Sequence, residues 1–368
     1  ASPGGVIDLA RDYYGLDGRW TWRDRLLAQP FTLTVGMNYD NLLESRKGFN
    51  NFVGTTTGII GALRRDESNR VTNFDQYAQA EWQPSAAWRA SAGIRHSSVR
   101  YSSQDHFITT GNGDDSGAVR YGATTPVAGV VYSVTPVLNV YATAGRGFET
   151  PTSNELAYRS SGATGLNFAL RPARSTSTEL GTKAMVGATT SINAALFRTE
   201  TTDEIVVQTN AGGRSTFQNA GRTRREGVEV AAQTGLPFRL QLTAALTWLR
   251  ARYDDAFQTC TAAPCTTPNV LVEAGKRIPG IPQSSAYAEL AWRPAIAGMT
   301  GAIEVRSVSR VYVDDRNSDF ADRYAVVNAR FALEQSIGRR WTIREVVRID
   351  NIFDRRIVGS VIVNESNG

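Results

Sequence analysis

Hydrophobic and polar residues alternate in steps of two along most of this chain. Between residues 239 and 249, Leu242, Leu246 and Trp248 fall on one face, while Gln241 and Thr243 fall on the other. A period of two is typical of a β-strand with one apolar face, and about fifteen segments show it while none shows a convincing helical period. The pattern therefore predicts an all-β chain, with segments that begin near residues 16, 31, 71, 87, 119, 136, 175, 189, 216, 238, 283, 300, 322, 341 and 357.

The connections between these segments are alternately short and long. Short turns are predicted at 27–30, 84–86, 135–136, 187–189, 235–237, 294–298 and 338–340, and long loops at 44–70, 104–118, 148–174, 208–215, 255–282 and 314–321. Antiparallel neighbours reverse at each turn, so this alternation places all short turns at one end of the sheet and all long loops at the other. Many segments also reach ten residues or more, the length with which a tilted strand crosses a bilayer. Together these features predict a transmembrane antiparallel up-and-down β-barrel.

Aromatic residues lie close to several of the predicted short turns. In an outer-membrane barrel, aromatic girdles mark the two interfaces between the apolar band and water. The residues expected in the girdle on the side of the short turns are Trp82, Trp88, Phe238, Trp292 and Trp341.

The composition excludes several classes of protein. The chain has 368 residues and a net charge of +5, yet its only lysines are Lys47, Lys183 and Lys276, which does not fit a generic nucleic-acid binder. Two cysteines and two histidines cannot build a zinc cage or an iron–sulfur site by themselves, so we expect no resident metal or cofactor. The long uncharged stretch 121–145 contains two prolines, so no transmembrane helix is predicted.

Four sequence motifs follow one another in order. The first is NVY at 139–141, which leads into GRGFETP at 145–151 and NEL at 154–156. The others are STELGTK at 177–183, NAGRTRREGVE at 219–229 and DNIFD at 350–354. The ordered set resembles the signature of TonB-dependent outer-membrane receptors of the ferric-siderophore type, and the resemblance covers nearly the whole chain.

The resemblance implies a barrel of 22 strands that is plugged by a separate N-terminal globular domain. We expect residues 1–368 to form a partial barrel domain of this kind, with the plug, the Ton box and the last strand absent from the chain. Because an open sheet edge is not tolerated in hydrocarbon, these residues alone should not form a stable closed transporter.

The same resemblance implies an active importer in the outer membrane of a Gram-negative bacterium. Such a receptor binds a scarce ligand, most simply a ferric siderophore, at its extracellular side and imports it with energy supplied through TonB. We expect a monomer that meets the TonB complex through the missing N-terminal segment and does no chemistry on its ligand, so it is not an enzyme. A copper complex, haem or a small quinone-like cofactor is an alternative ligand within this class.

Three other classes of function share some of these features. A passive porin has the same alternation and loop asymmetry but an unplugged lumen, and the ordered motifs argue against it. An outer-membrane hydrolase needs a histidine base, for which His96 and His106 are the only candidates, and neither is assigned a catalytic role. An adhesin or secretion barrel would carry a passenger domain, which this chain does not show.

The third motif holds a group of charged residues: Arg222, Arg224, Arg225 and Glu226. We expect them to form a ladder on the lumen wall where it meets the plug, in a structural role, while Gly221 and Gly227 permit close backbone approach. The surplus of arginine also suggests contact with outer-membrane lipid and anionic lipopolysaccharide. An arginine near the base of a loop could serve that purpose or line the lumen, and the sequence leaves both open.

The two cysteines, Cys260 and Cys265, lie close together in a predicted long loop. On a cell surface such a pair is expected to form a small structural disulfide that stiffens the loop. A two-thiolate metal site is the alternative.

Aromatic residues and arginines occur together in the predicted long loops. Guanidinium groups suit oxygen anions and aromatic faces suit planar chelates, so this mixture fits an anionic metal complex or a quinone-like molecule. The candidate ligand-binding residues are Tyr101, Tyr158, Arg159, Phe168, Arg171, Arg214 and Tyr253.

Overall fold

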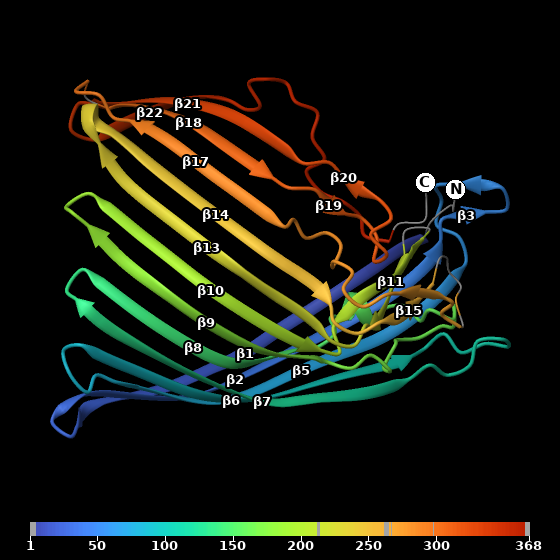
Figure 1. The fold of residues 1–368 in the computed structure, drawn as a ribbon. Helices are drawn as coiled ribbons and strands as arrows, with labels where there is room; N and C mark the ends of the chain where they lie inside the picture. Colours follow the sequence, from blue (N-terminus) through green and yellow to red (C-terminus); the bar gives the residue numbers. More distant parts are fainter. Residues whose placement is uncertain (1–4, 212–213, 261–264, 266, 297, 365–368) are drawn as a thin grey trace.

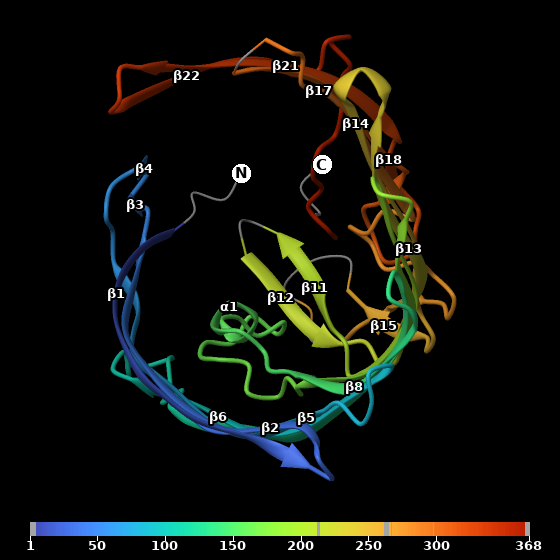
Figure 2. The same ribbon diagram turned by 90° about the vertical axis from the view of Figure 1, so that its left-hand side faces the viewer.

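The structure is a computed structural model that describes residues 5–211, 214–260, 265, 267–296 and 298–364. Its main element is one antiparallel sheet of fourteen strands, which curls around a central lumen (Figures 1 and 2). Each strand pairs with the next one of the sheet along the chain, and β1 (Gly5–Leu26) and β22 (Trp341–Ile349) form the two edges. The fold is therefore the predicted all-β up-and-down barrel wall, seen here as an open sheet.

The other strands of the sheet are β2 (Gln29–Asn50), β5 (Leu63–Trp82), β6 (Trp88–Asp105), β7 (Gly117–Thr135), β8 (Leu138–Glu149), β9 (Ala173–Val186), β10 (Thr190–Thr202), β13 (Thr223–Leu236), β14 (Leu240–Tyr253), β17 (Ser284–Trp292), β18 (Met299–Val308) and β21 (Tyr324–Ile337). Four two-stranded sheets lie in the loops: β3 (Phe52–Val53) with β4 (Thr56–Thr57), β11 (Ile205–Ala211) with β12 (Arg214–Asn219), β15 (Phe257–Thr259) with β16 (Val270–Val272), and β19 (Val311–Tyr312) with β20 (Phe320–Ala321). A short helix, α1 (Ser153–Leu156), and a 3-10 turn at Pro237–Arg239 complete the elements.

Each predicted short turn lies at a junction between two neighbouring strands, and Figure 1 shows these turns together at one end of the sheet. The long loops and their small hairpins gather at the opposite end. Two loop boundaries were wrong. The loop predicted at 208–215 spans the chain from 203 to 222 between β10 and β13 and contains the β11–β12 hairpin. The segment 44–70 contains the ends of β2 and β5, which leaves only residues 51–62 outside them. Its charged residues continue the period of two, so they belong to strands that extend beyond the apolar band.

The segment near residue 357 was predicted to be a strand, and the structure corrects this. The chain leaves the sheet after Ile349, and Asn351 forms a turn in which its amide group hydrogen-bonds the backbone N–H and carbonyl of Arg355 at 3.0 and 2.9 Å. Asn351 and Asp354 both adopt positive φ, which turns the chain away from the neighbouring strand. Residue Asn364 then bonds the carbonyl of Val207 in the β11–β12 hairpin.

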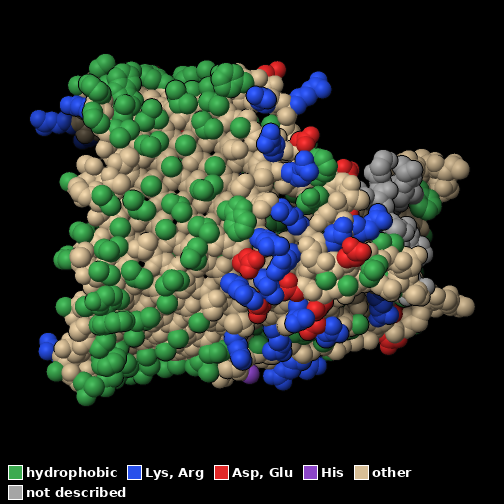
Figure 3. All heavy atoms as spheres, viewed as in Figure 1, with side chains coloured by type: hydrophobic (Ala, Val, Ile, Leu, Met, Phe, Trp, Pro, Cys, Tyr) green, Lys and Arg blue, Asp and Glu red, His purple; other side chains and the backbone are tan. Residues whose placement is uncertain are grey.

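The outer face of the sheet carries an apolar band at the end of the short turns (Figure 3). Trp88, Phe238, Trp292 and Trp341 are exposed there, and the ring of Trp88 lies 4.6 Å from that of Tyr132 on the next strand. These aromatic side chains sit where the girdle was expected.

Within the described ranges, no helix is long and apolar enough to cross a membrane.

The long loops fold into the lumen and pack against the wall, as Figure 2 shows for α1 and the β11–β12 hairpin. One buried cluster joins wall residues Tyr101 and Tyr121 to Leu156, Leu166 and Leu170 of the loop after β8. A second cluster around Tyr253 joins β14 to the hairpins and loops beside it. This packing fixes the loops that surround the candidate site.

Candidate functional site

A cavity of about 660 Å³ opens at the loop end of the lumen. Its walls come from segments far apart in the chain: the ends of β1, β2 and β5, the loop after β6, the loop after α1, and β12. Helix α1 positions one of these walls, because Thr152 and Glu155 form a capping box that holds its first turn. The residues that follow the helix, from Ala157 to Gly165, then line the cavity.

Tyr158 is the centre of the site. The guanidinium carbons of Arg46, Arg65 and Arg214 lie 5.9, 5.8 and 5.3 Å from the centroid of its ring. Each distance is within the range of a cation–π contact. One aromatic ring therefore gathers three positive charges that come from β2, β5 and β12.

Arg65 ties the strand wall to the loop. Its Nη1 atom donates to the carbonyl oxygen of Ala157 at 3.0 Å, and its Nε atom donates to the carboxylate of Glu67. The Glu67 side chain is only 4% exposed and also accepts from Asn69 Nδ2 at 3.3 Å. The Nη2 atom of Arg65 is buried and has no hydrogen-bond partner among the described residues, so one donor beside the cavity stays unused.

The cavity has a surplus of positive charge. It is lined by five arginines and three carboxylates, which leaves 5 − 3 = +2 among the described lining residues. Two carboxylates are engaged locally: Asp115 pairs with Arg159 at 3.7 Å, and Asp105 accepts the backbone N–H of Phe107 at 2.9 Å. Neither Arg46 nor Arg214 has an ion-pair partner in the part of the chain that the structure describes. The site therefore suits an anion with aromatic or planar parts.

Three of the seven predicted ligand residues meet in this cavity: Tyr158, Arg159 and Arg214. The other four lie elsewhere. Tyr101 is buried in the loop-packing cluster and Phe168 packs against it. Arg171 is exposed and binds Asp203 at 2.7 Å.

Tyr253, the seventh candidate, is fully buried, and its hydroxyl donates to Asp315 Oδ1 at 2.6 Å. Asn364 Nδ2 donates to the other carboxylate oxygen at 2.8 Å. Burial raises the pKa of Asp315, and the neighbouring Asp314 adds to this, against the effect of the two hydrogen bonds. The pair therefore holds the loop after β18 against β14 and is not placed to touch a ligand.

The raised pKa of Asp315 predicts a pH dependence for this loop. The folded protein holds the proton more firmly than the unfolded chain, so stability is fully present below the ordinary carboxyl pKa and falls as pH rises toward the folded pKa. We expect the protection factors of the amides of residues 311–321, which are corrected for the intrinsic pH dependence of hydrogen exchange, to be higher near pH 3.5 than at pH 7. Asp315→Asn, which cannot ionise, should remove that difference; an unchanged pH profile in the variant would contradict the assignment.

Several residues of the cavity were not predicted: Arg46, Arg64, Arg65 and Glu67. They lie in the segment 44–70, for which the sequence predicts a loop. The signal that could have identified them is the period of two, because Glu44 and Arg46, like Arg65 and Glu67, are spaced as strand residues that share one face.

The four charged residues of the third motif do not share one face, which corrects the expected ladder on the lumen wall. Arg224 lies opposite Glu200 and Arg252 in the sheet, and Glu226 lies opposite Arg198 and Arg250, on the outer face that also carries exposed Leu196 and Trp248. Arg222 precedes the strand and binds Asp255 at 2.8 Å. Only Arg225 faces inward, where its guanidinium binds Glu204 at 2.6 Å. Arg225 lies between Arg224 and Glu226 in one strand, so alternation places it on the opposite face and the four residues cannot line the lumen together.

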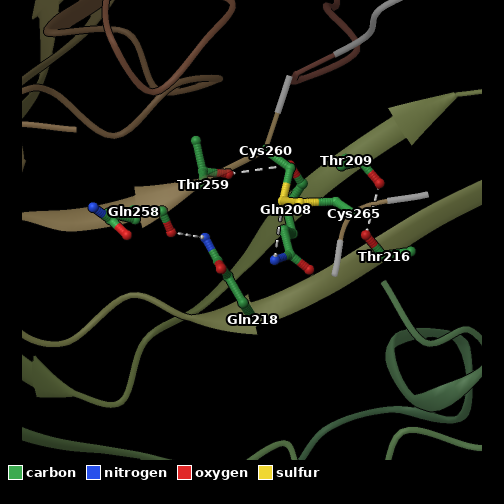
Figure 4. Close-up of a disulfide and its surroundings, with 8 residues drawn as sticks. All are labelled: Gln208, Thr209, Thr216, Gln218, Gln258, Thr259, Cys260 and Cys265. Atoms are coloured by element: carbon green, nitrogen blue, oxygen red, sulfur yellow. Dashed lines mark hydrogen bonds between the residues drawn. A yellow bond between two sulfur atoms is a disulfide. The ribbon is translucent and has the colours of Figure 1, made fainter. Parts of the chain in front are cut away.

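The predicted disulfide between Cys260 and Cys265 is confirmed (Figure 4), with Cα atoms 6.2 Å apart. Gln208 Nε2 lies 3.6 Å from Cys260 Sγ, and Thr259 Oγ1 donates to the carbonyl of Gln208 at 3.2 Å. The backbone N–H of Cys265 donates to the carbonyl of Ser160 at 2.7 Å. The disulfide loop thus contacts both the β11–β12 hairpin and the loop that carries Tyr158.

Among the described residues, no group of three or more His, Cys, Asp or Glu could hold a metal ion.

Comparison with known proteins agrees with the fold. The family model described as TonB dependent receptor-like, beta-barrel, matches residues 2–352. Among solved structures, the ferric-catecholate import receptor Fiu from K12 E. coli is 17% identical with a TM-score of 0.71, over 97% of this chain and 52% of that one.

Two further solved structures have the same architecture. The siderophore receptor PiuA from Acinetobacter baumannii is 15% identical with a TM-score of 0.75, over 95% of this chain and 53% of that one. The copper transporter OprC is 15% identical with a TM-score of 0.71, over 98% of this chain and 53% of that one. The chain spans about half the length of each of these proteins. It belongs to the TonB-dependent receptor family and carries the β-barrel region of such a receptor.

Proposed function

We propose that this chain is the barrel region of an outer-membrane uptake receptor for an anionic metal chelate, with a ferric siderophore as the leading ligand class. The observation that carries the proposal is the set of three guanidinium groups around the ring of Tyr158, in a cavity at the loop end of the lumen. Guanidinium groups bind oxygen anions in a fork, and the aromatic ring offers a flat apolar contact. A chelate with ionised oxygens and planar arms fits both.

Energy from TonB is part of the proposal, and family membership supports it. A plug domain would fill the lumen below the cavity, and Arg225, which faces inward, would meet it there. The receptor would act as a monomer. Uptake should stop when the inner-membrane proton gradient is dissipated, while binding at the cell surface should persist; uptake that continues would favour a passive pore.

Arg214→Ala tests the cavity directly. In the protein as its gene encodes it, we expect the affinity for a ferric tris-catecholate to fall about tenfold, because a charge-assisted contact worth about 1.4 kcal/mol is lost. Arg214 has no ion-pair partner among the described residues, so its removal should leave the fold intact. Fluorescence quenching or whole-cell retention of radioactive iron measures the change.

Arg316→Ala is the matched control. Arg316 is also an exposed loop arginine without a described ion pair, but it lies outside the cavity. Equal losses in the two variants would show a general charge effect and contradict a site at Tyr158. If a cupric complex or a quinone competes better than the iron complex, the ligand class changes while the cavity assignment stands.

A further inference from the structure

Arg100 and Arg120 lie on the outer face of β6 and β7, toward the loop end. Both are exposed, whereas the residues on either side of each of them pack in the lumen cluster with the loop after β8. These neighbours are Val99, Tyr101, Val119 and Tyr121. Successive side chains of a strand point to opposite faces. The two guanidinium groups therefore point away from the lumen.

The two arginines are directly opposite each other in the β6–β7 ladder. Arg70 joins them from β5, where it pairs with Ser102, two positions from Arg100. Arg70 Nε donates to Asn41 Oδ1 at 2.7 Å, and Arg120 Nε donates to Ser98 Oγ at 2.9 Å. None of the three has an ion pair among the described residues, and Arg100 has no hydrogen-bond partner there either.

Like charges directly opposite in a sheet are destabilising unless something compensates them. Another part of the outer wall does provide compensation. Glu200 of β10 and Asp254, which directly follows β14, pair with the arginines beside them: Arg224 reaches Asp254 at 2.7 Å and Arg252 reaches it at 3.3 Å. Figure 3 shows this interleaving of positive and negative side chains at the centre of the view. The group formed by Arg70, Arg100 and Arg120, the outer-wall arginine patch, has no such internal partner in the described chain.

The height of the patch is set by the strand. From Trp88, at the turn end, to Arg100 is 100 − 88 = 12 positions along β6. At about 3.3 Å per residue and a tilt of about 40°, this corresponds to roughly 30 Å along the membrane normal. The apolar band of an outer-membrane barrel is about 25 Å tall. The patch therefore lies at the level of the lipid head groups on the side of the long loops.

We propose that the outer-wall arginine patch binds the phosphate groups of an anionic glycolipid in the outer leaflet. Three guanidinium groups without carboxylates, at the depth of the head groups, match a polyanion that carries phosphates, because each guanidinium offers a planar fork for phosphate oxygens. Ser98 lies on the same outer face and accepts from Arg120, so its own hydroxyl hydrogen adds a donor. The bound phosphates supply the negative charge that the Arg100–Arg120 pair lacks.

The test uses the protein as its gene encodes it, in detergent, with diphosphorylated lipid A as the probe and native mass spectrometry as the readout. Arg100→Gln with Arg120→Gln should weaken lipid A binding about tenfold. Arg198→Gln is the control, because Arg198 lies on the same outer wall but is paired with Glu200; it should stay within about twofold. Equal binding by the patch variant and the wild type would overturn the proposal.

Arg100→Glu separates lipid binding from folding. The new carboxylate would face Arg120 directly, so the melting temperature should rise while lipid A binding falls. A structural role alone would not move these two readouts in opposite directions, and a variant that melts higher but binds lipid A normally overturns the proposal. Dephosphorylated lipid A should bind equally weakly to all forms. If millimolar inorganic phosphate displaces lipid A completely, the patch is a site for free anions and the lipid assignment fails.

Discussion

Arg65→Met is expected to weaken the candidate site more than the loss of any other single arginine. The change removes the bond to the Ala157 carbonyl, the contact with Tyr158 and the charge partner of Glu67. Glu67 would be left buried without a counter-charge, which destabilises the loop end by about 2 kcal/mol. A penalty of that size corresponds to roughly a 30-fold loss of affinity for a ligand that needs the loop in place. Hydrogen exchange of residues 150–172 and titration with a ferric tris-catecholate measure the two effects.

The double variant Arg65→Met with Glu67→Gln separates these effects. With both charges removed, no buried carboxylate is left unpaired, so the fold is not destabilised in this way. The protection of the loop amides from hydrogen exchange should therefore recover most of its wild-type value. Ligand affinity should stay low, because a guanidinium group is still missing beside Tyr158. Recovery of both properties would show that Arg65 acts only by supporting the loop.

Gly227→Ala is expected to disrupt the barrel wall itself. A Cβ atom at this position would lie 2.3 Å from the carbonyl oxygen of Trp248 and 2.7 Å from Cζ of Phe197. The oxygen belongs to the neighbouring strand, so relief requires β13 and β14 to move apart, at a cost of about 3 kcal/mol. The folded fraction, read from the heat-dependent shift of the barrel on a gel, should drop sharply.

Gly18→Ala provides the matched control within the same sheet. Gly18 is also a strand glycine, but a Cβ there meets nothing within 4 Å. It should therefore fold as well as the wild type, or slightly better, because alanine restricts the unfolded chain. Normal folding of Gly227→Ala would show that β13 and β14 can separate enough to hold the added methyl group, which would contradict this prediction.

The architecture could be predicted because it depends on local patterns. Alternation depends on neighbouring residues only, and the short turns are marked by residues such as Pro30, Pro84 and Pro136. The ends of the strands were harder to predict. Past the apolar band, both faces of β2 and β5 are polar, so Glu44 to Arg70 reads as a loop by composition although the period of two persists. Beyond residue 349 the chain kept an apolar composition but lost its neighbour in the sheet, because Asn351 turns it away.

The candidate site was only partly predictable, because it assembles residues that are distant in sequence. Tyr158 and Arg214 were expected from their loops, but nothing local shows that Arg46 and Arg65 converge on the same ring. Tyr253 has the same side chain as Tyr158, and yet it is buried against Asp315. Only the three-dimensional packing separates a tyrosine that supports a loop from one that faces a cavity.

The length of the first two strands gives the cavity two sides that are held in different ways. β1 and β2 span 22 residues each, and their continuous ladder carries Arg46 on a wall that cannot shift without breaking sheet hydrogen bonds. Tyr158 and Arg214, on the opposite side, belong to a loop and a small hairpin. Sheet hydrogen bonds therefore hold the strand side of the cavity, whereas side-chain packing holds the loop side. Exchange of the loop alone should change the choice of ligand, while the charged strand wall is kept as a fixed reference surface.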